Sequence, residues 1–121
     1  MSKFVLRPVA SGLKFDLCAS NGQEILSSEV YTSRAAALRG IGSVRKNAPG
    51  AHLENRTEEG CKACPNPKFE LYRDRAGAYR FRLKARNGQI IGVSEAYSGK
   101  NGALNGIESV MKNAADAEIE E

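Results

Sequence analysis

The sequence has few residues of the types that most often carry catalysis or hold a metal. It contains one histidine, His52, and three cysteines, Cys18, Cys61 and Cys64. A Ser-His-Asp or Cys-His catalytic device would therefore have to use His52. Neither a phosphate-binding glycine loop nor an H-E-x-x-H motif is present. These absences predict a protein that is not an enzyme and that needs no cofactor.

Long hydrophobic runs are also missing. No apolar segment approaches the roughly 18 residues of a membrane-spanning helix, so we expect no membrane partner. The first eight residues lack the apolar core and cleavage site of a signal peptide. An odd number of cysteines without an export signal argues against a disulfide framework. The expected location is the cytoplasm.

The charge is mildly basic but unevenly distributed. Residues 1–50 carry about +4, residues 68–115 carry about +5, and the tail from Asp116 carries about −4. Two basic segments followed by an acidic C-terminal tail are compatible with a polyanionic partner but do not require one.

The dominant feature is an internal duplication. Segments 15–48 and 81–114 align at a constant offset and are identical at 19 of 34 positions. Lys3-Phe4 and Lys68-Phe69 extend the match upstream. A unit of about 50–60 residues alone is marginal, because small domains bury a smaller share of their surface. We therefore expect repeats at 1–57 and 68–121, joined by a linker at 58–67, to form one compact domain.

The same strand pattern occurs in both copies of the repeat. Apolar residues alternate with polar ones in two segments, and an Asn-Gly pair follows, which predicts a hairpin with a type I′ turn. A third strand ends near a tyrosine, and a short strand-like piece closes each copy. The apolar positions of the first two strands are Phe4, Leu6, Phe15, Leu17 and Ala19, with Phe69, Leu71, Phe81, Leu83 and Ala85 in the second copy.

One helix is predicted per copy, from apolar residues at 3.6-residue spacing. Its expected N-caps are Thr32 or Ser33 in the first copy and Ser98 in the second. Asn47 and Asn113 are expected to end the helices in a left-handed conformation.

Both predicted helices have a glycine at mid-length, Gly40 and Gly106, which costs about 1 kcal/mol relative to alanine. A glycine at this position indicates that each helix closely approaches the sheet or the other helix. The predicted fold is α+β: one antiparallel sheet with both helices on a single face.

The repeated pattern resembles a known family. The sequence F-x-L-x-A-x-N-G-x-x-I, followed by S-E-x-Y and A-L-x-G-I-x-S-V-x-K-N-A, is similar to the YegP-like family of small bacterial proteins. The resemblance implies two strand-strand-strand-helix-strand units around one sheet, with the last strand of each unit exchanged onto the other. It implies no activity. Many relatives have a tryptophan in the second strand; this chain has none, and Phe15 and Tyr79 or Phe81 occupy that region.

The two copies differ most in their second strand. Strand alternation places four cations of the second copy, Arg80, Arg82, Lys84 and Arg86, on the face opposite Phe81. With Tyr72 on the adjacent strand, they resemble the charged and aromatic platform of single-strand nucleic-acid binders. The alternative is a solvated face whose cations pair across strands with Glu70 and Asp74, which share the parity of Tyr72.

Other functions are supported more weakly. Cys61-Lys62-Ala63-Cys64 has the spacing of a zinc or redox pair, but a structural zinc site needs four ligands, and only His52 and Cys18 are left to join. Ser28-Glu29 and Ser94-Glu95 recur in both copies and are expected to be structural. The working hypothesis is therefore a monomer with internal pseudo-two-fold symmetry that binds nucleic acid. The alternatives are a protein–protein interaction module and a metal- or redox-linked protein.

Overall fold

The computed structural model describes residues 2–121, so Met1 of the predicted first repeat lies outside the described part. The first half contains the strands β1 (Lys3–Val9), β2 (Gly12–Cys18) and β3 (Glu24–Ser27), the helix α1 (Arg34–Asn47), the 3₁₀ turn η1 (Ala48–Gly50) and the strand β4 (His52–Asn55). The second half contains β5 (Lys68–Arg73), β6 (Tyr79–Lys84), β7 (Ile90–Val93), α2 (Lys100–Asn113) and β8 (Glu118–Glu120). Within residues 2–121, neither helix has the length and apolar character needed to cross a membrane.

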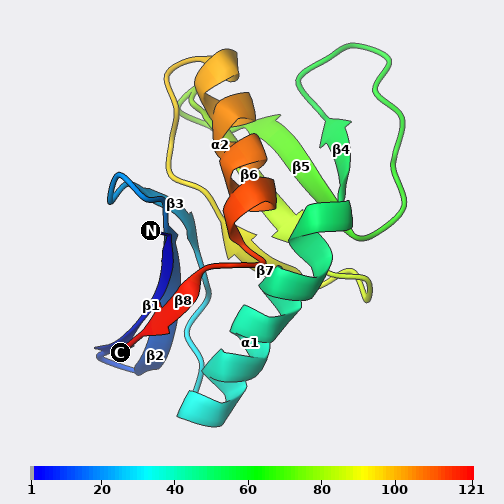
Figure 1. Cartoon of the computed structure of the whole chain (residues 1–121). Coiled ribbons are helices and arrows are strands. Elements are labelled where there is room, and N and C mark those ends of the chain that lie inside the picture. Colours follow the sequence, from blue (N-terminus) through cyan, green and yellow to red (C-terminus); the bar gives the residue numbers. More distant parts are fainter. Residues whose placement is uncertain (1) are drawn as a thin grey trace.

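All eight strands form one sheet in the order β4-β5-β6-β7-β3-β2-β1-β8. The halves meet at the centre, where β3 and β7 pair antiparallel through Ser27 and Val93. At the edges, β4 pairs with β5 and β8 pairs with β1, both in parallel. The last strand of each half thus lies beside the first strand of the other (Figure 1).

The prediction of a purely antiparallel sheet is wrong, because the edge pairings make the sheet mixed. A tight hairpin turn forces two strands to run antiparallel, and hairpins link β1 to β2 and β5 to β6. The edge strands follow helices instead. A connection of that length leaves the strand direction free.

Both helices lie across the same face of the sheet, in front of it in Figure 1. The strands present their apolar residues to the helices, and Phe4, Phe15, Phe69 and Phe81 are fully buried. Each half repeats one arrangement of rings. Phe15 packs edge-on against Phe4 and stacks on Tyr31, with centroids 5.8 and 6.0 Å apart.

The mid-helix glycines are explained by this packing. A Cβ at Gly106 would lie 2.6 Å from the Tyr97 hydroxyl and 2.9 Å from Phe81. At Gly40 the equivalent atom would meet the Tyr31 hydroxyl and would lie 3.0 Å from Phe15. The predicted close approach is therefore confirmed, and it is to the aromatic residues below each helix rather than to the sister helix.

The hairpin turns differ from the predicted type. A type I′ turn needs positive φ at both central residues, yet all positive-φ residues of the described chain are glycines. Gly22 has φ +85°, and its N–H donates to the carbonyl of Ala19. The N–H of Ala19 in turn donates to Gln23, which is the pattern of a three-residue loop with a glycine bulge. The hairpin prediction is right and the turn type is wrong.

The ends of the helices also differ from the prediction in two respects, the cap of α2 and the conformation of the terminal asparagines. Ser33 caps α1 by accepting from the N–H of Ala36, but α2 begins after Gly99 instead of Ser98 and has no side-chain cap. Neither Asn47 nor Asn113 is left-handed. Each instead donates its side-chain amide to a carbonyl one turn back in its own helix, so it stabilises the last turn without reversing the chain.

Candidate functional site

The open face of the second half is organised around a buried carboxylate, Glu70. Its side chain is 2% exposed, and Oε1 accepts a hydrogen bond of 2.6 Å from Nε of Arg82. Oε2 lies 3.3 Å from Nζ of Lys84, 3.5 Å from Arg56 and 3.6 Å from Lys68. One acid therefore compensates several cations on this face.

The electrostatics of Glu70 reflect a competition between burial and pairing. Burial raises the pKa of a carboxyl group, because the charged form loses its hydration. Hydrogen bonds from Arg82 and Lys84 outweigh that effect and lower the pKa of Glu70 to about 2. Glu70 is therefore ionised at neutral pH and serves as an internal counter-ion.

A second acid, Glu54 on β4, extends this cluster to the linker. Its Oε1 accepts from Nζ of Lys68 at 2.9 Å and from the N–H of Cys64 at 2.7 Å. These two hydrogen bonds lower the pKa of Glu54. Through them, the linker after β4 is fastened onto the edge of the sheet.

The remaining predicted residues of the open face are also engaged within the chain. Nε of Arg80 donates to Asp74 at 2.8 Å. The guanidinium of Arg82 lies 4.9 Å from the ring centroid of Tyr72 and covers that ring. Arg80, Arg82 and Lys84 are thus paired as the alternative interpretation expects, and one face of the Tyr72 ring is taken up by Arg82.

Arg86 is separated from the other three cations. Strand β6 ends at Lys84, so alternation no longer sets the direction of Arg86. It instead lines a groove of about 630 Å³ between α1 and the β6–β7 hairpin. The groove is lined by Arg39, Gly42, Ser43, Lys46, Asn47, Pro67, Ala85, Arg86 and Asn87.

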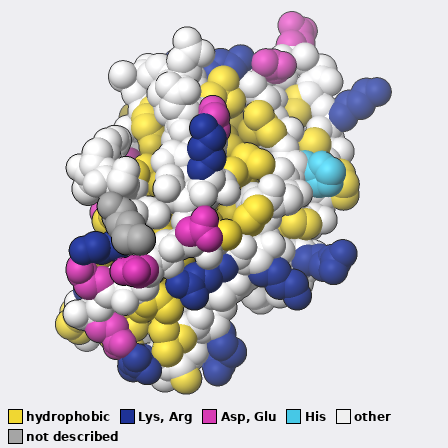
Figure 2. Space-filling view, viewed as in Figure 1, with side chains coloured by type: hydrophobic (Ala, Val, Ile, Leu, Met, Phe, Trp, Pro, Cys, Tyr) yellow, Lys and Arg dark blue, Asp and Glu magenta, His cyan; other side chains and the backbone are white. Residues whose placement is uncertain are grey.

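We call this site the basic groove, because its charged lining residues are all Lys or Arg. Arg39, Lys46 and Arg86 line it, and no Asp or Glu does. None of the three forms an ion pair with any residue of the range 2–121. Figure 2 shows Lys and Arg side chains at the lower right of this face, beside α1, without acidic side chains between them.

The pseudo-symmetric groove, between α2 and the β2–β3 hairpin, provides an internal comparison. It measures about 280 Å³ and is lined by Asn105 where the basic groove has Arg39. Ser20 stands at the position of Arg86. Lys112, the counterpart of Lys46, is paired at 3.0 Å with Glu108, which replaces Gly42. The shared fold builds both grooves, but only the groove at α1 collects unpaired cations.

Sequence reasoning missed Arg39 and the role of Lys46. Both lie on α1 away from its apolar stripe, seven residues apart and therefore on the same side of the helix. A comparison of the copies position by position contains the signal, because Arg39 and Arg86 are both replaced by neutral residues in the other copy.

The other predicted residues are not assembled into a site. Ser28 accepts a hydrogen bond from the N–H of Phe15 and donates to the carbonyl of Glu29, and Ser94 repeats this arrangement, so these residues are structural. All three cysteines are free thiols. Within residues 2–121, no group of three or more His, Cys, Asp or Glu side chains is placed to hold a metal, so neither His52 nor Cys18 joins the linker cysteines.

Comparison with known proteins is consistent with the duplicated fold. A family model described as "Domain of unknown function (DUF1508)" matches residues 11–54 and again 74–121. The UPF0339 protein YegP of Yersinia pestis is 43% identical over 107 residues, which cover 88% of this chain and 82% of that protein. A UPF0339 protein of Treponema denticola is 59% identical over 54 residues, which cover 45% of this chain but 93% of the relative.

Solved structures agree with this assignment. The solution structure of yegP from Escherichia coli, a protein described as of unknown function, is 33% identical with a TM-score of 0.80, covering 98% of this chain and 90% of that one. The UPF0339 protein SO3888 of Shewanella oneidensis also has a TM-score of 0.80 at 33% identity, covering 98% and 89% of the two chains. The chain belongs to the DUF1508 (UPF0339, YegP-like) family.

Proposed function

We propose that this protein is a binding module for polyanions such as single-stranded nucleic acid, and that it is not an enzyme. The observation that carries the proposal is the basic groove: Arg39, Lys46 and Arg86 surround one hollow, and none of them is paired with an acid of residues 2–121. Unpaired cations attract phosphates, and their binding releases the counterions condensed on the nucleic acid.

The proposal moves the contact surface from the open sheet face to the basic groove. A phosphate approaching Arg82 or Lys84 would compete with Glu70, which is buried and already bonded to both. A phosphate entering the groove displaces no acidic side chain of the described residues 2–121 from Arg39, Lys46 or Arg86. Asn87 and Ser43 line the same groove and add neutral donors.

The expected recognition is of phosphates and not of bases. Single-strand binders that stack bases expose aromatic rings, whereas the ring of Tyr72 is covered by Arg82 and that of Tyr79 by Arg73 at 5.0 Å. Affinity should therefore depend strongly on salt and weakly on base sequence.

We further propose that the two halves act as one monomeric unit. The pairing of β4 with β5 and of β8 with β1 ties each half to the other at both edges of the sheet. The basic groove needs both halves, because Arg39 and Lys46 come from the first and Arg86 from the second.

A fluorescence-anisotropy titration with labelled single-stranded DNA and RNA tests the proposal. We expect binding at low salt that weakens as salt is raised. The triple variant Arg39→Gln, Lys46→Gln, Arg86→Gln should lose about tenfold or more in affinity and show a shallower salt dependence.

A matched control removes the same charge elsewhere. Lys62→Gln, Arg75→Gln, Lys112→Gln changes three exposed cations outside the groove and leaves the net charge equal to that of the groove variant. It should bind nearly as the parent does. Absence of binding at low salt, or equal losses in both variants, would refute the groove as the site.

A protein partner is the second candidate, favoured by the sheet edges. The outermost strands β4 and β8 expose the large apolar side chains of Leu53 (45%) and Ile119 (37%). Capture of partners from lysate with and without nuclease separates the two functions. Protein captured only in the presence of nucleic acid favours the first function, and protein retained after nuclease treatment favours the second.

A further inference from the structure

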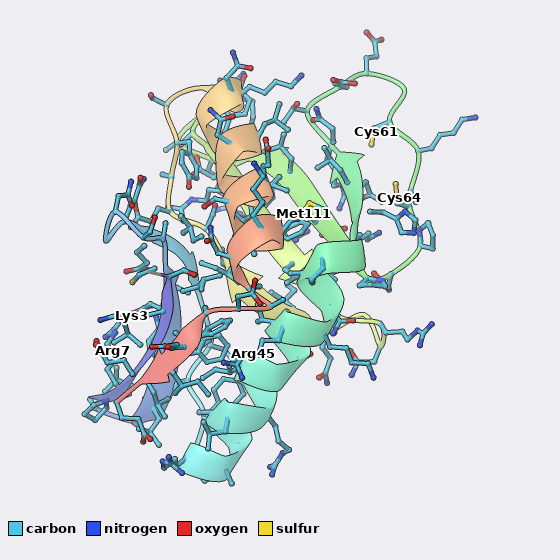
Figure 3. The ribbon with its side chains drawn as sticks, in the orientation of Figure 1. Lys3, Arg7, Arg45, Cys61, Cys64 and Met111 are labelled. Carbon is cyan, nitrogen blue, oxygen red and sulfur yellow. The ribbon has the colours of Figure 1, made fainter. Side chains whose placement is uncertain are left out.

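The linker between β4 and β5 brings two thiols together. The sulfur of Cys61 lies 3.7 Å and that of Cys64 lies 3.9 Å from the same oxygen, the carbonyl of Lys62. Both sulfurs therefore lie on the same side of this loop (Figure 3). Cys61 is exposed and Cys64 is half-buried, so small molecules can reach the pair.

Cys64 is also the point at which the linker is held to the sheet. Its N–H donates to Glu54 and its carbonyl accepts from Nζ of Lys68 at 3.1 Å. Cys61, three residues earlier, has no comparable anchor: its N–H donates only to the carbonyl of Glu58 at 3.3 Å. A covalent link from Cys61 to Cys64 would tie the free part of the linker to the fixed part.

The third cysteine belongs to a different environment. Cys18 ends β2, which is separated from β4 in the sheet by β5, β6, β7 and β3. Burial, followed by the nearby charge of Asp16, raises the pKa of the Cys18 thiol. Since the thiolate is the reactive form, Cys18 should react more slowly than an exposed thiol.

We propose that Cys61 and Cys64 form a reversible disulfide by exchange with a low-molecular-weight disulfide of the oxidised-glutathione type. The thiolate of Cys61 attacks the S–S bond of the small molecule, forms a mixed disulfide and expels one small thiolate. The thiolate of Cys64 then attacks the sulfur of Cys61 and expels the second. Two electrons pass to the small disulfide, and the two protons lost by the cysteines end on the two small thiols.

The expected consequence is a linker that is fixed in the oxidised form and opens more readily in the reduced form. Lys62 lies between the cysteines in an exposed stretch, so trypsin cleavage after it reports on this segment. Ring closure restricts the conformations that a protease needs to bind. It also keeps the two fragments joined after cleavage.

The experiment is oxidation of the folded protein by oxidised glutathione, followed by intact mass measurement and timed trypsin digestion. We expect the protein to lose the mass of two hydrogen atoms and to keep one alkylatable thiol, Cys18. Cleavage after Lys62 should be slowed severalfold. Reductant should reverse all three changes. Cys18→Ser should show the same mass loss and the same slowed cleavage, but no alkylatable thiol should remain. Cys61→Ser should instead retain a glutathione adduct on Cys64 and stay sensitive to trypsin.

Three results would overturn the proposal. These are glutathione adducts on both linker cysteines without ring closure, a disulfide that involves Cys18, and a purified protein whose linker thiols are protected by a bound metal. Circular dichroism of each variant checks that the fold is retained, so that a change in trypsin sensitivity is assigned to the linker.

Discussion

At the residue scale, one glycine in each helix is fixed by the aromatic residue below it. Tyr31 stacks on Phe15 with an interplanar angle of 12°, and Tyr97 stacks on Phe81 in the same way. Because each tyrosine ring is held by this stacking, its hydroxyl cannot move aside for a methyl group. The helix accepts the lower propensity of glycine in order to lie close to the sheet.

Alanine substitutions at two glycines of α1 should have opposite effects. Gly40→Ala forces a methyl group against Tyr31 and Phe15, and overpacking of this kind costs about 1–3 kcal/mol. Gly42→Ala meets no atom within 4 Å and gains up to about 1 kcal/mol of helix propensity. Urea denaturation should therefore show a less stable and a more stable variant. Stabilisation by both would contradict the packing described for Gly40.

Glu70 makes the stability of the protein sensitive to acid. Its pKa is about 2 in the folded protein and about 4.3 when unfolded, so its contribution is complete above the unfolded value and disappears as the pH falls toward 2. The linked free energy is on the order of 3 kcal/mol. We expect Glu70→Gln to destabilise the protein at pH 7.

The pH dependence of that difference is the diagnostic measurement. Thermal unfolding of the parent and of Glu70→Gln, followed from pH 7 to pH 2, should converge between about pH 4.5 and pH 2. Glu108→Gln removes only an exposed pair with Lys112 and should change stability by less than about 0.5 kcal/mol. A constant gap between parent and Glu70→Gln across this range would contradict the lowered pKa.

At the element scale, the sequence predicts a helix, strand or hairpin well when the residues that determine it are close together in the chain. Alternating residues around Asn21-Gly22 predict a hairpin, because the turn and its strands are adjacent in the chain. The pairing of β8 with β1 joins residues more than a hundred positions apart, and no local pattern sets its direction. The direction of Arg86 was mispredicted for a related reason: alternation holds only while a residue belongs to the strand.

The edge strand β8 should be needed to protect β1. Its segment is fastened by Arg45, which reaches from α1 to the carbonyl of Ala117 at 2.6 Å, and by a pair between Lys3 and Glu120 (Figure 3). Deleting residues 116–121 should cost more than about 2 kcal/mol and cause self-association, because the outer edge of β1 becomes unpaired.

Light scattering and chemical denaturation of the truncated protein check this expectation. The double variant Glu120→Gln, Glu121→Gln keeps the strand while removing its exposed ion pairs, so it should stay close to the parent. A truncated protein that is monomeric and equally stable would show that β8 is dispensable.

At the scale of the whole molecule, the two halves share a scaffold and differ in surface chemistry. The aromatic stacks, the bulged hairpins and the central pairing of β3 with β7 account for what the copies have in common. The differences define two kinds of surface, one in the second half and one built from both halves. One is the open face, whose cations are compensated by Glu70 and Asp74, and the other is the basic groove at α1.

The duplication explains why the sequence pointed to only one cation of the basic groove, Arg86. The sequence shows that the second copy is more basic in its second strand, and Arg86 belongs to that stretch. Its partners Arg39 and Lys46 come from the other copy, and only the packing of α1 beside the β6–β7 hairpin brings them together. A site assembled from both halves leaves no continuous motif.

The most direct test is a two-dimensional NMR titration of the backbone amides with a short single-stranded oligonucleotide. The account predicts shifts concentrated at Arg39, Ser43, Lys46 and Asn87, with the equivalent residues of the groove at α2, Asn105 and Ser109, unaffected. Equal shifts in both grooves, shifts confined to the open face around Arg82, or no shifts at low salt would contradict it.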